Sequence, residues 1–123
     1  MHKHVQHEYP LEACGLIAGK EGQSVHIYEI QNELRSPIRF RMQPKQQLLA
    51  LLDMEDKAFD LLAIYHSHPN GPSGPSSTDV REAAYPEALH LIWSRSRSAW
   101  TANAFRIFSD RIDSLPITIS KQE

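Results

Sequence analysis

The sequence predicts an α/β fold in which helices pack against a mostly β core. Apolar segments of strand length recur along the chain, and one segment with helical spacing interrupts them. The chain has 123 residues, of which 41% are apolar and 23% charged, so it falls in the globular range. A core of this size needs no disulfide framework. We therefore expect residues 1–123 to form a single domain.

The first half of the chain predicts a hairpin followed by a helix. Residues 13–20 form a short apolar run and residues 24–31 alternate in polarity, which indicates two strands around a turn at 21–23. Residues 39–42 could add another short extended piece. Residues 44–59 begin with proline and carry leucines near helical spacing, so they form the clearest helix of the chain.

The second half predicts a central strand, a stiff loop and a short helix. Residues 61–66 are apolar up to His66, as expected for a strand that is covered on both faces. Residues 69–77 are rich in proline, glycine and serine, and the prolines reduce the entropy that the loop loses on ordering. Ser77 or Thr78 can cap a short helix over residues 79–84. Three further strands are expected at residues 89–93, 102–108 and 115–119.

Composition argues against nucleic acid and membrane partners. Lys and Arg number 13 against 15 Asp and Glu, and the net charge is −2. The one basic cluster, Arg35, Arg39 and Arg41, fits a solvated strand face as well as an acidic ligand. The apolar runs are far shorter than the roughly 20 residues of a membrane helix. A single cysteine and an N-terminus without an apolar signal segment indicate a cytoplasmic protein.

Two histidines at the end of the central strand predict a metal site. His66 and His68 are two residues apart, so on a continuing strand both rings point to the same face. Asp79 follows after a loop long enough to fold back and deliver a carboxylate. Zinc accepts nitrogen and carboxylate ligands in tetrahedral geometry, and three protein ligands leave the fourth position for water. A His-x-His pair alone is weak evidence, because such pairs arise by chance.

The residues around this pair strengthen the prediction. His68 is followed by Pro69, seven residues separate His68 from Ser76, and two more lead to Asp79. Upstream, Glu12 begins the run Glu-Ala-Cys-Gly. In these motifs the chain resembles the JAMM (MPN-plus) zinc metallopeptidase family, whose pattern is an upstream Glu-x-Cys-Gly, His-Ser/Thr-His-Pro, and Ser-x-x-Asp. Because it lacks long insertions, the chain resembles the compact bacterial and archaeal members.

The resemblance implies a mixed, curved β-sheet packed against helices, in an architecture like that of cytidine deaminases. It implies that His66, His68 and Asp79 bind Zn²⁺, that Glu12 moves the proton, and that Ser76 hydrogen-bonds the developing oxyanion. The implied reaction is hydrolysis of an amide bond after the C-terminal Gly of a ubiquitin-like or sulfur-carrier protein with a Gly-Gly tail. The released group would be cysteine or a conjugated protein.

Several residues keep a second interpretation. Ser77 is adjacent to Ser76, and only the spacing selects Ser76 over it. Cys14 is expected to be a small packed hydrophobe rather than a nucleophile. The N-terminal histidines His2, His4 and His7 are expected to be solvated. His26 and His90 have no partner at metal-site spacing. The ten or so residues before Glu12 leave room only for a short or incomplete first helix.

Two rival functions follow from the same residues. A catalytically silent scaffold is the main alternative, although relatives of that kind usually lack a ligand and this chain retains all three. A zinc deaminase would need a Pro-Cys-x-x-Cys motif, which a chain with one cysteine cannot supply. For the peptidase, residues 37–42 could pair with an extended substrate tail as an added strand.

Overall fold

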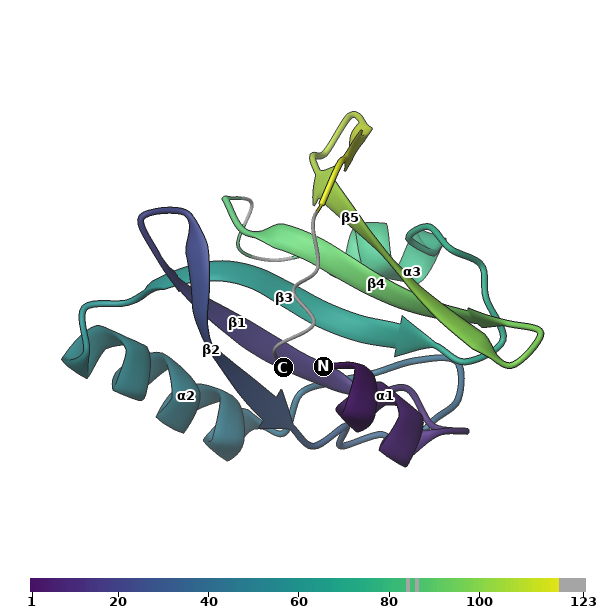
Figure 1. Cartoon of the computed structure of the whole chain (residues 1–123), viewed down its shortest axis with the longest axis horizontal. Helices are drawn as coiled ribbons and strands as arrows, with labels where there is room; N and C mark the ends of the chain where they lie inside the picture. Colours follow the sequence, from purple (N-terminus) through teal and green to yellow (C-terminus); the bar gives the residue numbers. More distant parts are fainter. Residues whose placement is uncertain (84, 86, 118–123) are drawn as a thin grey trace.

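The computed structural model describes residues 1–83, 85 and 87–117 (Figure 1). Their core is one six-stranded sheet, and helices lie against it, which confirms the predicted mixed α/β fold. In chain order the elements are α1 (His2–Glu8), β1 (Cys14–Lys20), β2 (Gln23–Ile30), α2 (Pro44–Asp56), β3 (Asp60–His68), α3 (Ser77–Arg81), β4 (Leu89–Ser96), β5 (Ala99–Ile107) and β6 (Ile112–Leu115). No helix among the described residues is long and apolar enough to cross a membrane.

The sheet brings the ends of two central strands to the same edge. Its strand order is β2-β1-β3-β4-β5-β6, and β3 and β4 pair in parallel while all other neighbours are antiparallel. The connection between the parallel strands contains the proline-rich loop and α3, as Figure 1 shows. The carboxyl ends of such strands are a common place for ligand sites in α/β sheets. His68 lies there, opposite Ser94 of β4.

The two faces of the sheet are covered by different helices. Ala50 and Met54 of α2 pack in one cluster with Leu16 and Ile64, whereas Val5 of α1 packs in the other, which includes Tyr65. Because side chains alternate along a strand, His66 and His68 share the face of Ile64, on the side of α2. The core therefore separates the histidine face from the face under α1.

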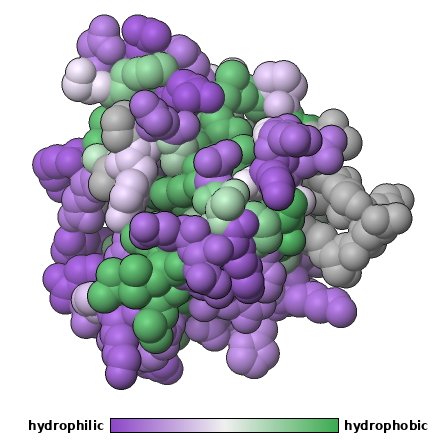
Figure 2. Space-filling view, turned by 90° about the vertical axis from the view of Figure 1, so that its left-hand side faces the viewer, coloured by the Kyte–Doolittle hydropathy of each residue, from purple (hydrophilic) through white to green (hydrophobic). Residues whose placement is uncertain are grey.

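The helix predicted at residues 44–59 is present but ends earlier, at Asp56. Pro44 opens it as expected, and the Gln43 side chain accepts a hydrogen bond from the N–H of Gln46. At its end Ala58 turns with φ +56°, and the N–H of Phe59 donates to the Met54 carbonyl at 2.8 Å. Its outer side carries the exposed residues Leu48, Leu49 and Leu52. In the lower part of Figure 2, where α2 lies, hydrophobic side chains reach the surface.

One strand prediction is confirmed in part and another is wrong. Residues 39–42 form no regular strand, but an antiparallel bridge joins Asn32 to Met42, and the Glu33 N–H donates to the Arg41 carbonyl at 2.8 Å. The last strand covers Ile112–Leu115 instead of residues 115–119, because Pro116 has no N–H to continue the ladder. Residues 118 and 119 lie outside the described part of the chain. The hairpin at 21–23 is confirmed, with positive φ at Glu21 and Gly22.

The N-terminal segment is better ordered than predicted. The first helix is short, as expected, but His4 is buried rather than solvated, and its Nδ1 lies 2.7 Å from the Tyr65 hydroxyl oxygen. His2 packs beside Trp93, whereas His7 remains exposed. The reason is tertiary: α1 has to cover the sheet face that contains Tyr65, and His4 lies on its inner side.

Cys14 is a packed residue, as predicted. It is fully buried, its Sγ donates to the Ile30 carbonyl at 3.4 Å, and burial raises the pKa of its thiol to about 12. A buried thiol with so high a pKa has almost no thiolate at neutral pH, so it is a poor nucleophile.

We predict that Gly15→Ala lowers the free energy of unfolding by about 2–3 kcal/mol, measured by urea denaturation. A Cβ at position 15 would collide with ring carbons of Tyr65 and with the Tyr28 carbonyl oxygen. Gly74→Ala is the matched control, since a Cβ there only approaches Phe105 at 3.9 Å. Equal stability of the two variants would contradict the close packing at Gly15.

Candidate metal centre

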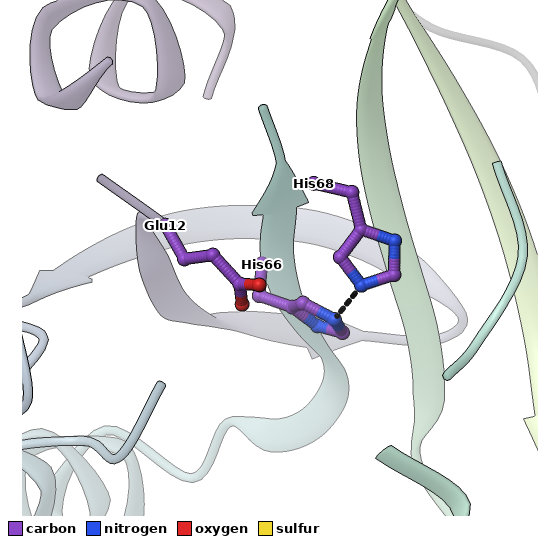
Figure 3. Close-up of side chains that lie close together, drawn as sticks. All are labelled: Glu12, His66 and His68. Carbon is purple, nitrogen blue, oxygen red and sulfur yellow. Dashed lines mark hydrogen bonds between the residues drawn. The ribbon is translucent and has the colours of Figure 1, made fainter. Parts of the chain in front are cut away.

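The last residues of β3 place two imidazoles side by side. His66 and His68 are both buried and lie on the same face, with their Nε2 atoms 3.0 Å apart. Figure 3 shows the two rings converging at the end of the strand. The strand continues through His68, which is why the predicted i, i+2 geometry holds.

Asp79 reaches the histidines through the cap of α3. The Ser76 side chain accepts a hydrogen bond from the N–H of Asp79 at 3.0 Å, and Asp79 Oδ2 accepts one from the N–H of Ser76 at 2.8 Å. This capping box begins the helix at Ser77, so the cap is Ser76 and not Ser77 or Thr78, and the predicted start at Asp79 is two residues late.

The same carboxylate oxygen faces both imidazoles. Asp79 Oδ2 lies 3.2 Å from His66 Nε2 and 3.0 Å from His68 Nε2. Three ligand atoms around a tetrahedral zinc ion are about 3.3 Å apart, since zinc–nitrogen and zinc–oxygen distances are about 2.0–2.2 Å. The three atoms therefore have nearly the separation that a zinc ion requires.

The tautomer of His68 also fits a cation. Its Nδ1–H donates to the Pro72 carbonyl at 2.8 Å, which leaves a lone pair on Nε2. That lone pair faces Asp79 Oδ2, which can also only accept. Two acceptors held this close need a proton or a cation between them. The residues present thus fit a metal of the zinc type.

Glu12 lies beside this group because β1 pairs with β3. The register places Cys14 opposite His66, so Glu12, two residues earlier, reaches the end of β3. The Ala13 N–H donates to Ser67 Oγ at 2.8 Å, which fixes the approach. In Figure 3 the carboxyl group points toward the histidines, and ligand atoms of Glu12, His66 and His68 lie within 4.8 Å of one another.

The electrostatics differ among the four groups. Burial raises the pKa of Glu12 to about 8, with Asp79 adding to the rise and His68 opposing it, and its Oε1 has no hydrogen-bond partner in the described part. Burial lowers the pKa of His66, which favours a neutral imidazole. Burial opposes the charged forms of Asp79 and His68, but hydrogen bonds outweigh it. Those from His66 and His68 lower the Asp79 pKa, and those to Asp79 and to the Pro72 carbonyl raise the His68 pKa.

Three residues that the sequence did not single out belong to this neighbourhood. Phe40 stacks on His66, with ring centroids 4.5 Å apart. His90 is buried in a pocket of about 190 Å³, and its Nε2 has no partner among the described residues. Asn32 is buried and hydrogen-bonds the Glu12 carbonyl at 3.1 Å. In the sequence, only Phe40 gave any indication of such a role, as an aromatic residue between Arg39 and Arg41.

The pocket opens beside the histidines. One wall is the segment from Ile38 to Met42, the opposite wall includes Thr78 and Glu82 of the α3 region, and His66 and Asp79 border it. Arg39 bridges the two walls through an ion pair with Glu82 at 3.2 Å.

Comparison with known proteins agrees with this fold and site. A family model described as prokaryotic homologs of the JAB domain matches residues 1–107. A "CysO-cysteine peptidase" of Mycobacterium tuberculosis is 33% identical over 123 positions, which cover 97% of this chain and 84% of the relative. A "Desampylase" of Pyrococcus furiosus is 37% identical over 70 residues, covering 57% of this chain and 50% of the relative.

A solved structure has the same fold over nearly the whole chain. The solution structure of protein DSY2949 from Desulfitobacterium hafniense superposes with a TM-score of 0.84 at 32% identity, and covers 98% of this chain and 86% of that one. Together with the family match over residues 1–107, this shows that the chain belongs to the prokaryotic homologs of the JAB domain, the JAMM-like family that its motifs resemble.

Proposed function

We propose that this chain is a zinc-dependent peptidase that hydrolyses the amide bond after the C-terminal Gly of a ubiquitin-like or sulfur-carrier protein. The observation that carries the proposal is the triangle of His66 Nε2, His68 Nε2 and Asp79 Oδ2, with the buried Glu12 carboxyl beside it. The names of relatives support the substrate class, since they describe a CysO-cysteine peptidase and a probable TtuB-protein conjugate cleaving protease.

In this proposal His66, His68 and Asp79 hold the zinc ion. A bound zinc ion supplies a Lewis acid, which polarises the scissile carbonyl and lowers the pKa of water toward about 7. The Pro72 carbonyl keeps His68 in the tautomer that presents Nε2, and the Ser76 N–H orients the Asp79 carboxylate. These two hydrogen bonds would orient the proposed ligand atoms for metal binding.

Glu12 is the proposed proton carrier. Its carboxylate takes a proton from the attacking water and delivers that proton to the leaving nitrogen as the carbon–nitrogen bond breaks. The products are the tail carboxylate and a free amine, so one water molecule is consumed and no other reactant is needed. The position is suitable because a buried carboxyl group has a pKa near neutrality, where proton transfer in both directions is efficient.

Ser76 is the proposed oxyanion donor. Its Oγ already accepts the N–H of Asp79, so the oxygen is held in place while the hydroxyl proton remains available to donate. A fixed donor aimed at growing negative charge stabilises the transition state more than the ground state.

The substrate tail is proposed to lie in the pocket between Ile38–Met42 and the α3 region. Residues 37–42 form no regular strand and pair only at the bridge from Met42 to Asn32, so an extended Gly-Gly tail could bind to the remaining backbone as an added strand. Residues 1–123 would then form one catalytic domain that acts in the cytoplasm.

The first test measures metal content. We predict about one zinc per purified wild-type chain, none for His66→Ala, and about one for Glu12→Gln, by atomic emission after gel filtration. His26→Ala is the control, because His26 is exposed on β2 and its loss should leave the metal in place. Absence of zinc in the wild-type chain, with no activity on adding it, would favour the non-catalytic scaffold.

The second test measures cleavage. We predict that the wild-type chain removes a single cysteine appended to the Gly-Gly tail of a ubiquitin-fold sulfur carrier, observed by intact mass. Glu12→Gln should keep zinc and lose cleavage, because an amide cannot accept the proton. Normal cleavage by Glu12→Gln would eliminate the proposed proton carrier.

The third test separates Ser76 from its neighbour. We predict that Ser76→Ala lowers kcat about 10²–10³-fold, the usual loss for one oxyanion donor. It also removes the α3 cap, at a cost of about 1 kcal/mol. Ser76→Thr, which keeps a hydroxyl, should recover part of the rate, and Ser77→Ala should match wild type. If Ser77→Ala were as slow as Ser76→Ala, the assignment of the oxyanion role to Ser76 would be wrong.

A further inference from the structure

One buried amide side chain connects the two sides of the proposed active site. Asn32 follows β2, is 3% exposed, and bonds only to backbone groups. Its Nδ2 donates to the Glu12 carbonyl at 3.1 Å and to the Arg39 carbonyl at 3.0 Å. Its Oδ1 accepts the N–H of Leu34 and the N–H of Arg41, both at 3.1 Å.

These bonds use the full capacity of an amide. Two N–H donors and two acceptor lone pairs are all satisfied, with one longer contact from Nδ2 to the Ser36 carbonyl at 3.5 Å. An aspartate has the same shape but cannot donate when ionised, and an alanine offers neither group. No other side chain of this size can replace both sets of bonds, so the position demands asparagine chemically.

The partners of Asn32 belong to the machinery of the site. On one side is the backbone of Glu12, whose N–H is also held by the Ser36 carbonyl at 2.8 Å. On the other side is the irregular segment 33–41, which has no strand partners over most of its length and whose residues 38–41 line the pocket. That segment also carries Phe40, whose ring stacks on His66.

We propose that Asn32 is a positioning residue that couples the pocket wall to Glu12. It touches neither metal ligands nor substrate, and acts by holding the Glu12 backbone and residues 39–41 at a fixed separation. A tail that binds against this wall is thereby held in register with the proton carrier. The inference rests on the proposed function and deepens it.

A merely structural role would have a different outcome. Loss of any buried hydrogen bond on this sheet lowers the free energy of unfolding by about 1–3 kcal/mol, but well below the melting temperature it leaves the rate unchanged. Tyr28→Phe is the control: Tyr28 lies on β2, four residues before Asn32, and donates to Asp53 Oδ2 at 2.6 Å in a partly buried hydrogen bond away from the proposed metal ligands. Its loss should affect stability alone.

The experiment compares Asn32→Ala, Asn32→Asp and Tyr28→Phe, each loaded with zinc, on the cysteine-extended sulfur carrier. We expect both Asn32 variants to keep about one zinc, to lose kcat about 10–100-fold, the cost of a misplacement near 1 Å, and to raise KM. Tyr28→Phe should keep both constants. Asn32→Asp, with the original shape, serves if Asn32→Ala fails to fold.

A second readout is independent of turnover. Amide hydrogen exchange on the metal-free chains should be faster at Glu12 in both Asn32 variants, and faster at Leu34 and Arg41 in Asn32→Ala than in Asn32→Asp, which retains the acceptor. Unchanged exchange at Glu12, or Asn32 variants with the kcat of Tyr28→Phe, would overturn the inference. If the wild-type chain cleaves nothing, the proposed function fails, and exchange alone decides whether Asn32 positions Glu12.

Discussion

A single carboxylate oxygen organises this end of the molecule. Asp79 Oδ2 accepts the N–H of Ser76 and at the same time faces the Nε2 atoms of His66 and His68. The first contact begins a helix, and the other two join that helix to the central strand across the eight-residue connection of residues 69–76. The partly buried carboxylate would be costly alone, and it is tolerated because every neighbour it meets is a donor or can be one. Local helix capping and the proposed metal site therefore use the same group.

The sheet supplies the remaining geometry. The antiparallel register of β1 and β3 sets Glu12 next to residues more than fifty positions away, and the two-residue alternation of β3 sends His66 and His68 to the same side. A shift of β1 or of β3 by one residue would move Glu12, or both histidines, to the face under α1. The packing of both faces, by α1 and by α2, is what prevents such a shift.

Much of this could be predicted from the sequence, because it depends on short periods and fixed spacings. The apolar run before His66, the helix beginning at Pro44 and the His-x-His pair are local patterns, and all were found. Residues 39–42 pair with the backbone only at the bridge from Met42 to Asn32, because the Asn32 side chain binds the backbone of Arg39 and Arg41, and sequence periodicity does not show such a contact. His4, Phe40 and His90 were missed because only tertiary packing gives a lone histidine or phenylalanine its neighbours. The motif spacing selected Ser76 as the oxyanion donor. Its second role, as the cap of α3, became visible only in the structure, where its side chain accepts the N–H of Asp79.

The loop between His68 and Ser76 has a consequence for how folding relates to metal binding. Three sets of hydrogen bonds within the protein anchor it: the His68 ring to the Pro72 carbonyl, the Gly71 N–H to the His68 carbonyl, and the capping box at Ser76. In small zinc modules the ion supplies most of the folding energy, so chelators unfold them. Here the proposed ligands lie on the sheet and the loop, so if this chain binds zinc as proposed, removal of the ion should leave the fold intact and binding should be nearly rigid and reversible.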